Sequence, residues 1–216
     1  MFIDIVFPED NEDEFIGIAS RLGYSALCFI YEYDKNKISR YAELIKNKQK
    51  NTKLKLYSGI LADFNEISQA KKYRSLVLVK NSEKNRDVLE KSKADVLFDL
   101  ERQSKNDFLH HRASGLNHIL CNLANKNKII IGFSFNSILN SKNMAQILGR
   151  ISQNIKLCRK YKVKMSIASF AKNAYEMRST HDLVSLFLVL GMHQKEAKDS
   201  LKNALERIMS NSKIEN

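Results

Sequence analysis

Short apolar runs alternate with longer amphipathic stretches along the chain. Seven runs rich in β-branched and aromatic residues predict strands over residues 2–6, 26–31, 55–62, 76–80, 95–99, 129–134 and 164–170. Runs such as Ile129, Ile130 and Ile131 are apolar at consecutive positions, which is typical of a parallel strand buried on both faces. The pattern therefore predicts a parallel sheet in which helices follow the strands.

The stretches between these strands have the periodicity of helices. Helices are predicted over residues 10–22, 36–49, 64–72, 83–92, 115–126, 142–161, 180–191 and 194–210. In the helix predicted over 142–161, one apolar stripe consists of Met144, Ile147, Leu148, Ile151, Ile155 and Cys158. The basic residues Arg150, Lys156, Arg159 and Lys160 lie off this stripe. The C-terminal stretch from His193 to Asn216, with an apolar face formed by Ala197, Leu201, Leu205 and Ile208, is predicted to pack as a helix or to meet a partner.

The order of these elements predicts an α/β fold, an irregular TIM-like (β/α) barrel with about seven strands. An open, doubly wound sheet has the same local signature, because strand order cannot be derived from periodicity, and it stays open as the structural alternative. With one proline, seven glycines and no low-complexity tract or internal repeat, the chain is expected to form a single domain over residues 1–216.

The composition excludes a membrane protein and a disordered chain. Apolar residues make up 44% and charged residues 28% of the chain, and no apolar run approaches the ~18 residues of a membrane span. The first residues, Met1 to Val6, have the pattern of a strand and lack a basic leader, so we expect a cytoplasmic protein. Cys28, Cys121 and Cys158 are odd in number and lie in apolar surroundings, so we expect buried thiols in a reducing compartment.

Positive charge is concentrated in the second half of the chain. The net charge is +12; residues 1–100 hold 17 basic and 16 acidic side chains, whereas residues 101–216 hold 19 and 8. The 68 residues from Phe108 to Tyr175 contain eleven Lys or Arg and no Asp or Glu. Solvated surfaces usually mix their signs, and clustered cations release counterions from a polyphosphate, so a nucleic acid is the expected partner. An acidic membrane would satisfy the charge alone, but the block lacks a basic amphipathic arm with exposed aromatic residues, so no membrane partner is expected.

A second basic stretch lies in the first half of the chain. Residues 35–55 hold eight Lys or Arg against Glu43 alone. Whether this stretch adjoins the larger block depends on the fold, so it counts only as a candidate extension of the nucleic-acid surface.

The sequence lacks the motifs of common enzyme classes. It contains no GxxxxGK, GxGxxG, GxSxG or CxxC motif, and its histidines, His110, His111, His118, His181 and His193, form no H-x-H. We therefore expect no catalytic residue, bound cofactor or metal site. The predicted strands end on polar residues, namely Asp4, Tyr31, Asp99, Ser134 and Ser169. These are expected to cap helices and satisfy buried backbone groups rather than to catalyse a reaction.

An ordered set of short motifs spans the second half of the chain. It comprises Gly115-Leu116-Asn117-His118-Ile119-Leu120, Ile131-Gly132-Phe133-Ser134, Ala168-Ser169, Arg178, Asp182 and Leu190-Gly191-Met192. In order and spacing the set resembles archaeal ribonuclease P protein component 3, the family that includes the thirty-kilodalton subunit of eukaryotic ribonuclease P. The likeness covers essentially the whole chain and is strongest from residue 94 to residue 193.

The resemblance implies a fold and a function. It implies a barrel related to the polymerase-and-histidinol-phosphatase (PHP) barrel of metal-dependent phosphoesterases without their metal-binding histidines, and the first strand here indeed has Ile3-Asp4-Ile5 in place of H-x-H. It further implies a ribonuclease P subunit that works with the catalytic RNA and with ribonuclease P protein component 2 and the other protein components on precursor tRNA. The RNA and its Mg²⁺ would cleave the 5′ leader, so the protein is not expected to be catalytic on its own.

The resemblance also implies RNA-binding positions. They are Arg112, His118, Lys126 and Arg178, with Lys84, Arg86 and Lys160 as weaker candidates. Two of them have an alternative, since His118 could hydrogen-bond within the barrel and Arg178 could pair with Asp182 four residues later. RNA contacts are in doubt at His111, Ala113 and His181, where this sequence departs from the family pattern. A metal-dependent phosphoesterase of the PHP type and a general RNA-binding module remain the functional alternatives.

Overall fold

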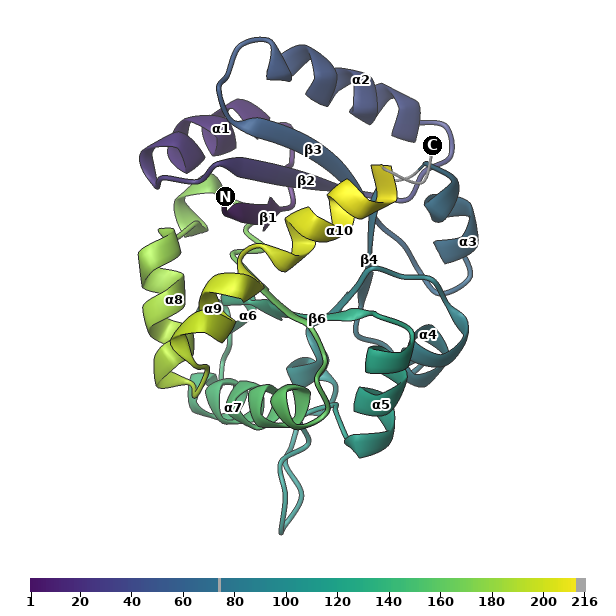
Figure 1. Cartoon of the computed structure of the whole chain (residues 1–216), viewed down its shortest axis with the longest axis vertical. Coiled ribbons are helices and arrows are strands. Elements are labelled where there is room, and N and C mark those ends of the chain that lie inside the picture. Colours follow the sequence, from purple (N-terminus) through teal and green to yellow (C-terminus); the bar gives the residue numbers. More distant parts are fainter. Residues whose placement is uncertain (74, 213–216) are drawn as a thin grey trace.

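A ring of parallel strands forms the centre of the protein. The computed structural model describes residues 1–73 and 75–212 (Figure 1). The strands are β1 (Ile3–Val6), β2 (Ala26–Glu32), β3 (Lys55–Leu61), β4 (Leu76–Lys80), β5 (Val96–Phe98), β6 (Ile130–Ser134) and β7 (Met165–Ala168). They pair in sequential order from β1 to β7, and every pair is parallel. All seven predicted strands are confirmed, and no strand end differs from its predicted position by more than two residues.

The sheet nearly closes between its first and last strands. The N–H of Phe170 donates to the carbonyl of Ile5 at 2.9 Å, and the N–H of Phe7 donates to the carbonyl of Ala171 at 2.8 Å. Asp4 adds a side-chain link, since its Oδ1 accepts from the N–H of Ser169 at 2.6 Å. Sequential strand order and these links make the fold an irregular barrel and overturn the alternative of a doubly wound sheet.

Helices surround the ring (Figure 1). They are α1 (Glu12–Arg21), α2 (Ile38–Gln49), α3 (Ile67–Ala70), α4 (Asn85–Lys91), α5 (His118–Lys126), α6 (Phe135–Leu139), α7 (Met144–Lys160), α8 (Thr180–Val189), α9 (Gln194–Ser200) and α10 (Asn203–Ser212), with 3-10 turns η1 (Lys71–Tyr73), η2 (Leu100–Arg102) and η3 (Ala174–Glu176). The short α6, η2 and η3 were not predicted, because they are too brief to show periodicity. Residues 213–216 of the predicted C-terminal stretch lie outside the described residues.

The helix predicted over 194–210 is two helices. The chain breaks at Leu201, whose carbonyl accepts from the N–H of Ile3 on β1 at 3.1 Å. Asn203 then donates from Nδ2 to the carbonyl of Met165, at the start of β7, at 2.7 Å. The break therefore lets α10 lie across the N-terminal ends of the strands, where Leu205 and Ile208 join the apolar interior of the barrel.

The outer helices bury their apolar stripes against the strands. Most of the stripe predicted on α7 is buried, but Met144 is 46% exposed and is not a core residue. Arg150, by contrast, is 1% exposed. It lies off the apolar stripe, as predicted, but it is buried and not at the surface. Cys28, Cys121 and Cys158 are free and buried, as expected from their apolar surroundings.

Candidate functional site

The loop between β5 and α5 forms one wall of a groove. This groove loop (residues 103–117) and the start of α5 face α7 across a cavity of about 810 Å³. The polar and aromatic side chains that line it are Gln103, Ser104, Phe108, His111, Arg112, Ser114, Asn117, His118, Gln153 and Tyr161. None of the described residues that line the groove is Asp or Glu. Two predicted RNA-binding residues, Arg112 and His118, therefore meet in a groove without negative charge.

The Gly-Leu-Asn-His motif shapes the α5 side of the groove. Gly115 has φ +79°, and a side chain there would collide with the carbonyl of Leu100, so only glycine fits this turn. Asn117 caps α5 by accepting from the N–H of Leu120 at 2.9 Å. His118 is the first residue of α5 and is exposed, and no hydrogen bond from its ring to the described residues occurs. The alternative that His118 is tied within the barrel is therefore wrong.

An ion pair between the buried Arg150 and the more exposed Asp107 holds the groove loop against α7. Arg150 donates from Nε to Asp107 Oδ1 at 2.7 Å and from Nη1 to the carbonyls of Glu101 at 2.8 Å and Ser104 at 2.6 Å. Asp107 Oδ1 also accepts from the N–H of Ala113 at 2.9 Å, which joins the two arms of the loop. Desolvation opposes the charge of Asp107, but the hydrogen bonds from Arg150 and Ala113 outweigh it and lower the pKa of this carboxyl. Arg150 is thus an anchor of the loop, although the sequence placed it only within the basic block.

An interior glycine makes room for Arg112. A Cβ atom on Gly149 of α7 would lie 2.7 Å from Nε and 3.0 Å from Cζ of Arg112. The guanidinium therefore lies directly over the α7 backbone. Sequence reasoning missed this contact, and the available signal was a glycine inside an otherwise regular helix, where it costs about 0.5–1 kcal/mol relative to alanine.

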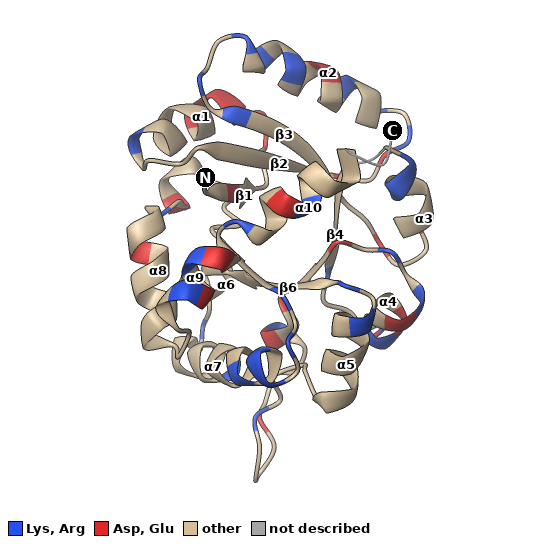
Figure 2. Cartoon of the chain, viewed as in Figure 1, with Lys and Arg blue, Asp and Glu red and all other residues tan. Residues whose placement is uncertain are grey.

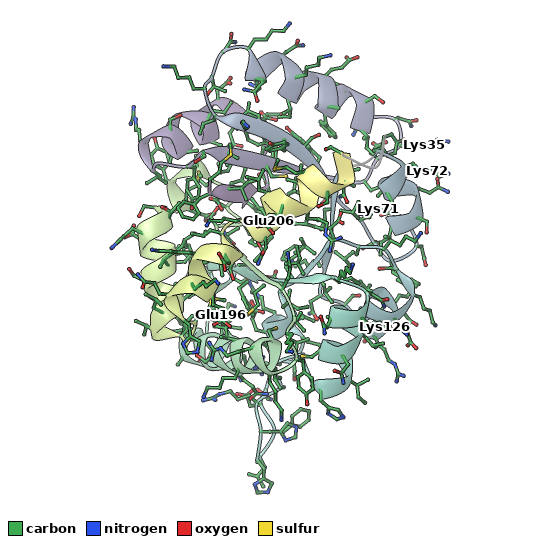
Figure 3. All side chains as sticks on the ribbon, in the orientation of Figure 1. Lys35, Lys71, Lys72, Lys126, Glu196 and Glu206 are labelled. Carbon is green, nitrogen blue, oxygen red and sulfur yellow. The ribbon has the colours of Figure 1, made fainter. Side chains whose placement is uncertain are left out.

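Two further candidates lie at the far ends of α5 and α7. Lys160 ends α7, and its ammonium lies 5.6 Å from the ring centroid of Tyr161, which lines the groove. Lys126 ends α5 and is exposed, and Figure 3 labels it at that helix. Lys160 thus borders the groove, whereas Lys126 is not among its lining residues.

The remaining candidates lie away from the groove or are partly engaged. Lys84 extends over the ring of Phe64, with its Nζ 5.5 Å from the centroid, and Arg86 pairs with Glu90 on α4 at 3.4 Å. Arg178 donates from Nη1 to the carbonyls of Met177 at 2.8 Å and Tyr175 at 3.1 Å.

The alternative pairing of Arg178 with Asp182 is wrong. Asp182 instead accepts from the hydroxyl of Ser179, the N-cap of α8, at 2.8 Å. Arg178 precedes α8, so the two residues do not share a helix. Its guanidinium lies over the ring of Phe135, with Cζ 5.1 Å from the centroid.

The basic stretch at residues 35–55 does not join the groove. It includes α2, which lies at the top of the view in Figure 2, whereas α7 lies at the bottom. The two helices cover opposite sides of the barrel, so this stretch does not extend the groove surface.

The barrel mouth, at the C-terminal ends of the strands, holds a separate cavity of about 460 Å³. Its described lining residues include three carboxylates, on Glu9, Glu32 and Asp99, and no His or Cys. Glu9 pairs with Lys172 at 3.4 Å, and Asp99 accepts from the hydroxyl of Ser137 at 2.5 Å. This donor set does not fit a cluster of metal ions. In the described part of the chain, no group of three or more His, Cys, Asp or Glu is placed to hold a metal ion.

The polar residues at the strand ends have structural roles. Ser134 caps α6 by accepting from the N–H of Ser137 at 3.0 Å, and Tyr31 donates to Glu12 at 2.9 Å. Asp4 and Ser169 join β1 to β7, and burial raises the pKa of Asp4 to about 6. These contacts confirm the prediction that the strand-end residues cap and pack.

The fold and the mouth define the class of protein: a parallel α/β barrel whose described mouth residues include no His or Cys and do not form a metal-binding donor set. The solved structure of histidinol phosphate phosphatase from Lactococcus lactis subsp. lactis matches with a TM-score of 0.65 at 11% identity, over 89% of this chain and 94% of that chain. A chain in the cryo-EM structure of archaeal ribonuclease P with mature tRNA matches with a TM-score of 0.82 at 23% identity, over 98% and 92% of the two chains. Both likenesses show a shared fold.

Sequence comparison then gives the family. Residues 1–216 match the family described as RNase P subunit p30, and the chain belongs to this family of ribonuclease P protein subunits. Ribonuclease P protein component 3 of Methanococcus maripaludis is 31% identical over 195 residues, which covers 84% of this chain and 78% of the relative. The component 3 of Methanocaldococcus jannaschii is 29% identical over 194 residues, covering 85% and 79%. The resemblance inferred from the ordered motifs is confirmed.

In the described residues, no helix is long and apolar enough to cross a membrane.

Proposed function

We propose that this ribonuclease P subunit binds the catalytic RNA through the groove and so supports Mg²⁺-dependent removal of the 5′ leader from precursor tRNA. Hydrolysis of the phosphodiester belongs to the RNA and the Mg²⁺ ions that the RNA binds. The protein supplies cations that neutralise crowded phosphates and lower the free energy of folding the RNA. Its partners in this proposal are the ribonuclease P RNA, precursor tRNA, component 2 and the other protein components, in the cytoplasm.

The proposal depends on one observation, the groove that gathers Arg112 and His118 and has no acidic residue among its described lining. A guanidinium can donate two parallel hydrogen bonds to one phosphate, whereas an ammonium acts as a point charge. Lys160 continues the positive charge along the rim beside Tyr161. The groove is therefore suited to a polyanion that also offers hydrogen-bonding and stacking groups.

The other candidates take secondary roles in this proposal. Lys126 is exposed and extends the basic surface along α5. Lys84 and Arg86 lie on or beside α4, which packs against α5, and Arg86 is already paired with Glu90. Arg178 uses one side of its guanidinium for backbone carbonyls, so the opposite side is left for a phosphate.

Reconstituted cleavage of precursor tRNA in Mg²⁺ tests the function. The reactions compare the protein alone, the ribonuclease P RNA of the same organism with component 2, and all three together. Cleavage raised only in the full mixture supports the proposal. Cleavage by the protein alone would reveal an active site in the barrel, and the absence of any effect would indicate a different RNA partner.

The residue assignment needs a matched pair of variants. Arg112→Ala should weaken binding to the ribonuclease P RNA about tenfold and lower the slope of log K against log salt by about 0.7–0.9, the loss of one phosphate contact. Arg21→Ala removes the same charge from an exposed position at the end of α1 and should change neither quantity. Equal effects of the two variants would show that only net charge matters and that the groove is not the binding site.

A further inference from the structure

The tip of the groove loop presents an exposed aromatic pair. The rings of Phe108 and His111 stack with centroids 4.5 Å apart and an interplanar angle of 24°. A tight turn supports the pair, since the N–H of Phe108 donates to the carbonyl of His111 at 2.9 Å. Phe108 is 61% exposed, and Leu109 beside it is 91% exposed. The tip projects from the body of the protein below α7 (Figure 1), so these apolar groups face solvent instead of the core.

The tip is held in place from its base. Asp107 and Arg150 fix the two arms of the loop, and Arg150 also holds the carbonyls of Glu101 and Ser104. The aromatic pair is thus presented on an anchored support, and a ligand that stacks on it need not order the whole loop. Preorganisation of this kind lowers the entropic cost of binding.

The surroundings of the tip favour a nucleotide over an apolar protein surface. Phe108 and His111 both line the groove, in which the described polar groups are amides, hydroxyls, imidazoles and the guanidinium of Arg112. The single carboxylate of the tip, Asp107, is neutralised by Arg150. Aromatic faces beside hydrogen-bond donors and a cation are the components with which proteins bind single-stranded nucleic acid.

We propose that the Phe108–His111 pair stacks on an unpaired base of the RNA while Arg112 holds an adjoining phosphate in the groove. A base within a duplex has both faces covered by its neighbours, so the stacking partner must be a bulged, looped or terminal nucleotide. The inference rests on the proposed function, because it assigns part of the same groove to one chemical feature of the RNA. It adds a specificity for unpaired over paired RNA that cations alone do not provide.

Three variants of the full chain test the stacking. Phe108→Ala should weaken binding to the ribonuclease P RNA about tenfold, since one base stacked on an aromatic ring contributes a factor of this order. Its slope of log K against log salt should equal that of the wild type, because no cation is lost. Phe108→Trp should retain the affinity, and Phe108→Leu, which is apolar but not aromatic, should lose it.

A second measurement uses defined probes. Wild-type protein should bind a twelve-nucleotide single-stranded oligoadenylate more tightly than a duplex of the same length, and Phe108→Ala should remove this difference. Full affinity for both RNAs in Phe108→Ala would overturn the inference. The inference would also be overturned if Phe108→Ala bound RNA normally but no longer bound component 2, because the tip would then be a protein contact.

The design separates this inference from the proposed function. Suppose that wild-type protein binds the ribonuclease P RNA, that Arg112→Ala weakens this binding and that Phe108→Ala does not. The groove then binds RNA, and the stacking inference is wrong. If wild-type protein fails to bind the ribonuclease P RNA, the proposed function itself fails, and the stacking inference with it.

Discussion

Arg112 lies over the backbone of Gly149, and no residue with a side chain fits beneath it unless the guanidinium moves. A Cβ atom at position 149 would be 2.7 Å from Nε of Arg112. Gly149→Ala should therefore displace the guanidinium from the groove and weaken binding to the ribonuclease P RNA by about three- to tenfold. The helix itself should not suffer, because alanine is favoured over glycine in a helix interior by about 0.5–1 kcal/mol. Binding titrations and thermal unfolding of the same sample measure the two effects.

A second glycine provides the control for this substitution. Gly17 lies within α1, and a Cβ atom there meets nothing within 4 Å. Gly17→Ala should stabilise the protein by about 0.5–1 kcal/mol and leave RNA binding unchanged. A Gly149→Ala protein that binds RNA as well as Gly17→Ala does would show that the position of Arg112 over α7 is irrelevant to binding.

Arg150 should be a stability residue, although it belongs to the basic block. Arg150→Ala leaves Asp107 and the carbonyls of Glu101 and Ser104 without their donor. Asp107 stays in contact with water, so the expected loss of unfolding free energy is about 1.5–3 kcal/mol, the contribution of a hydrogen bond to a charged group. Urea unfolding should show this loss, and limited proteolysis should cut the groove loop faster. Lys156, on the same helix but exposed, gives the comparison. Lys156→Ala should alter neither measurement, and an equally mild effect of Arg150→Ala would contradict the anchoring role.

Arg178 should contribute to both folding and RNA binding. Its guanidinium holds the carbonyls of Tyr175 and Met177, and the carbonyl of Arg178 itself accepts from the hydroxyl of Tyr24 at 2.8 Å. Arg178→Ala removes the guanidinium contacts alone and should lower the free energy of unfolding by about 1–2 kcal/mol. The variant should remain folded at 25 °C and bind RNA more weakly. Circular dichroism at the temperature of the binding titration checks both statements together, and an unfolded variant would remove the support for an RNA contact.

The barrel was predictable from the sequence because its strands are buried on both faces. Residues such as Ile129 to Ile131 then have to be apolar at every position, and this pattern survives without knowledge of tertiary contacts. The order of the strands in the sheet could not be predicted from this pattern. It follows from the pairing of the strands and from links such as Asp4 to Ser169, which join the first strand to the residue after the last one.

The groove was only partly predictable. The ordered motifs indicated Arg112 and His118, but periodicity on α7 could not show that Arg150 and Asn154 are buried. They are covered by the groove loop, as when Asn154 donates from Nδ2 to the carbonyl of Ser114 at 2.8 Å. A loop that packs against the side of a helix widens the buried face of that helix. The periodicity of the helix sequence does not predict this contact, because the loop residues lie elsewhere in the chain. The exposed Phe108 and Leu109 were missed for a related reason, since an apolar pair in a loop gives no periodic signal.

Burial of Glu101 should make the stability of the protein depend on pH. The side chain is fully buried, and neither carboxylate oxygen has a hydrogen-bond partner within the described residues. Desolvation, with a smaller contribution from the charge of Asp99, raises the pKa of Glu101 from 4.5 to about 8. The folded protein therefore holds this proton more tightly than the unfolded chain does. The full stabilisation is present below pH 4.5. It is lost as the pH rises from 4.5 through about 8, and the free energy of unfolding falls by about 1.4 kcal/mol for each pH unit in this range.

Glu101→Gln isolates this effect from the other titrating groups. The amide is close in shape to the protonated carboxyl and has no charge to lose, so the variant should gain stability over the wild type as the pH is raised. The difference in unfolding free energy should be small at pH 5 and reach a few kcal/mol by pH 9. Urea denaturation at a series of pH values measures it. A difference that stays constant from pH 5 to pH 9 would mean that Glu101 titrates in the folded protein as it does in water, and hence that the carboxyl is hydrated where it lies beneath the groove loop.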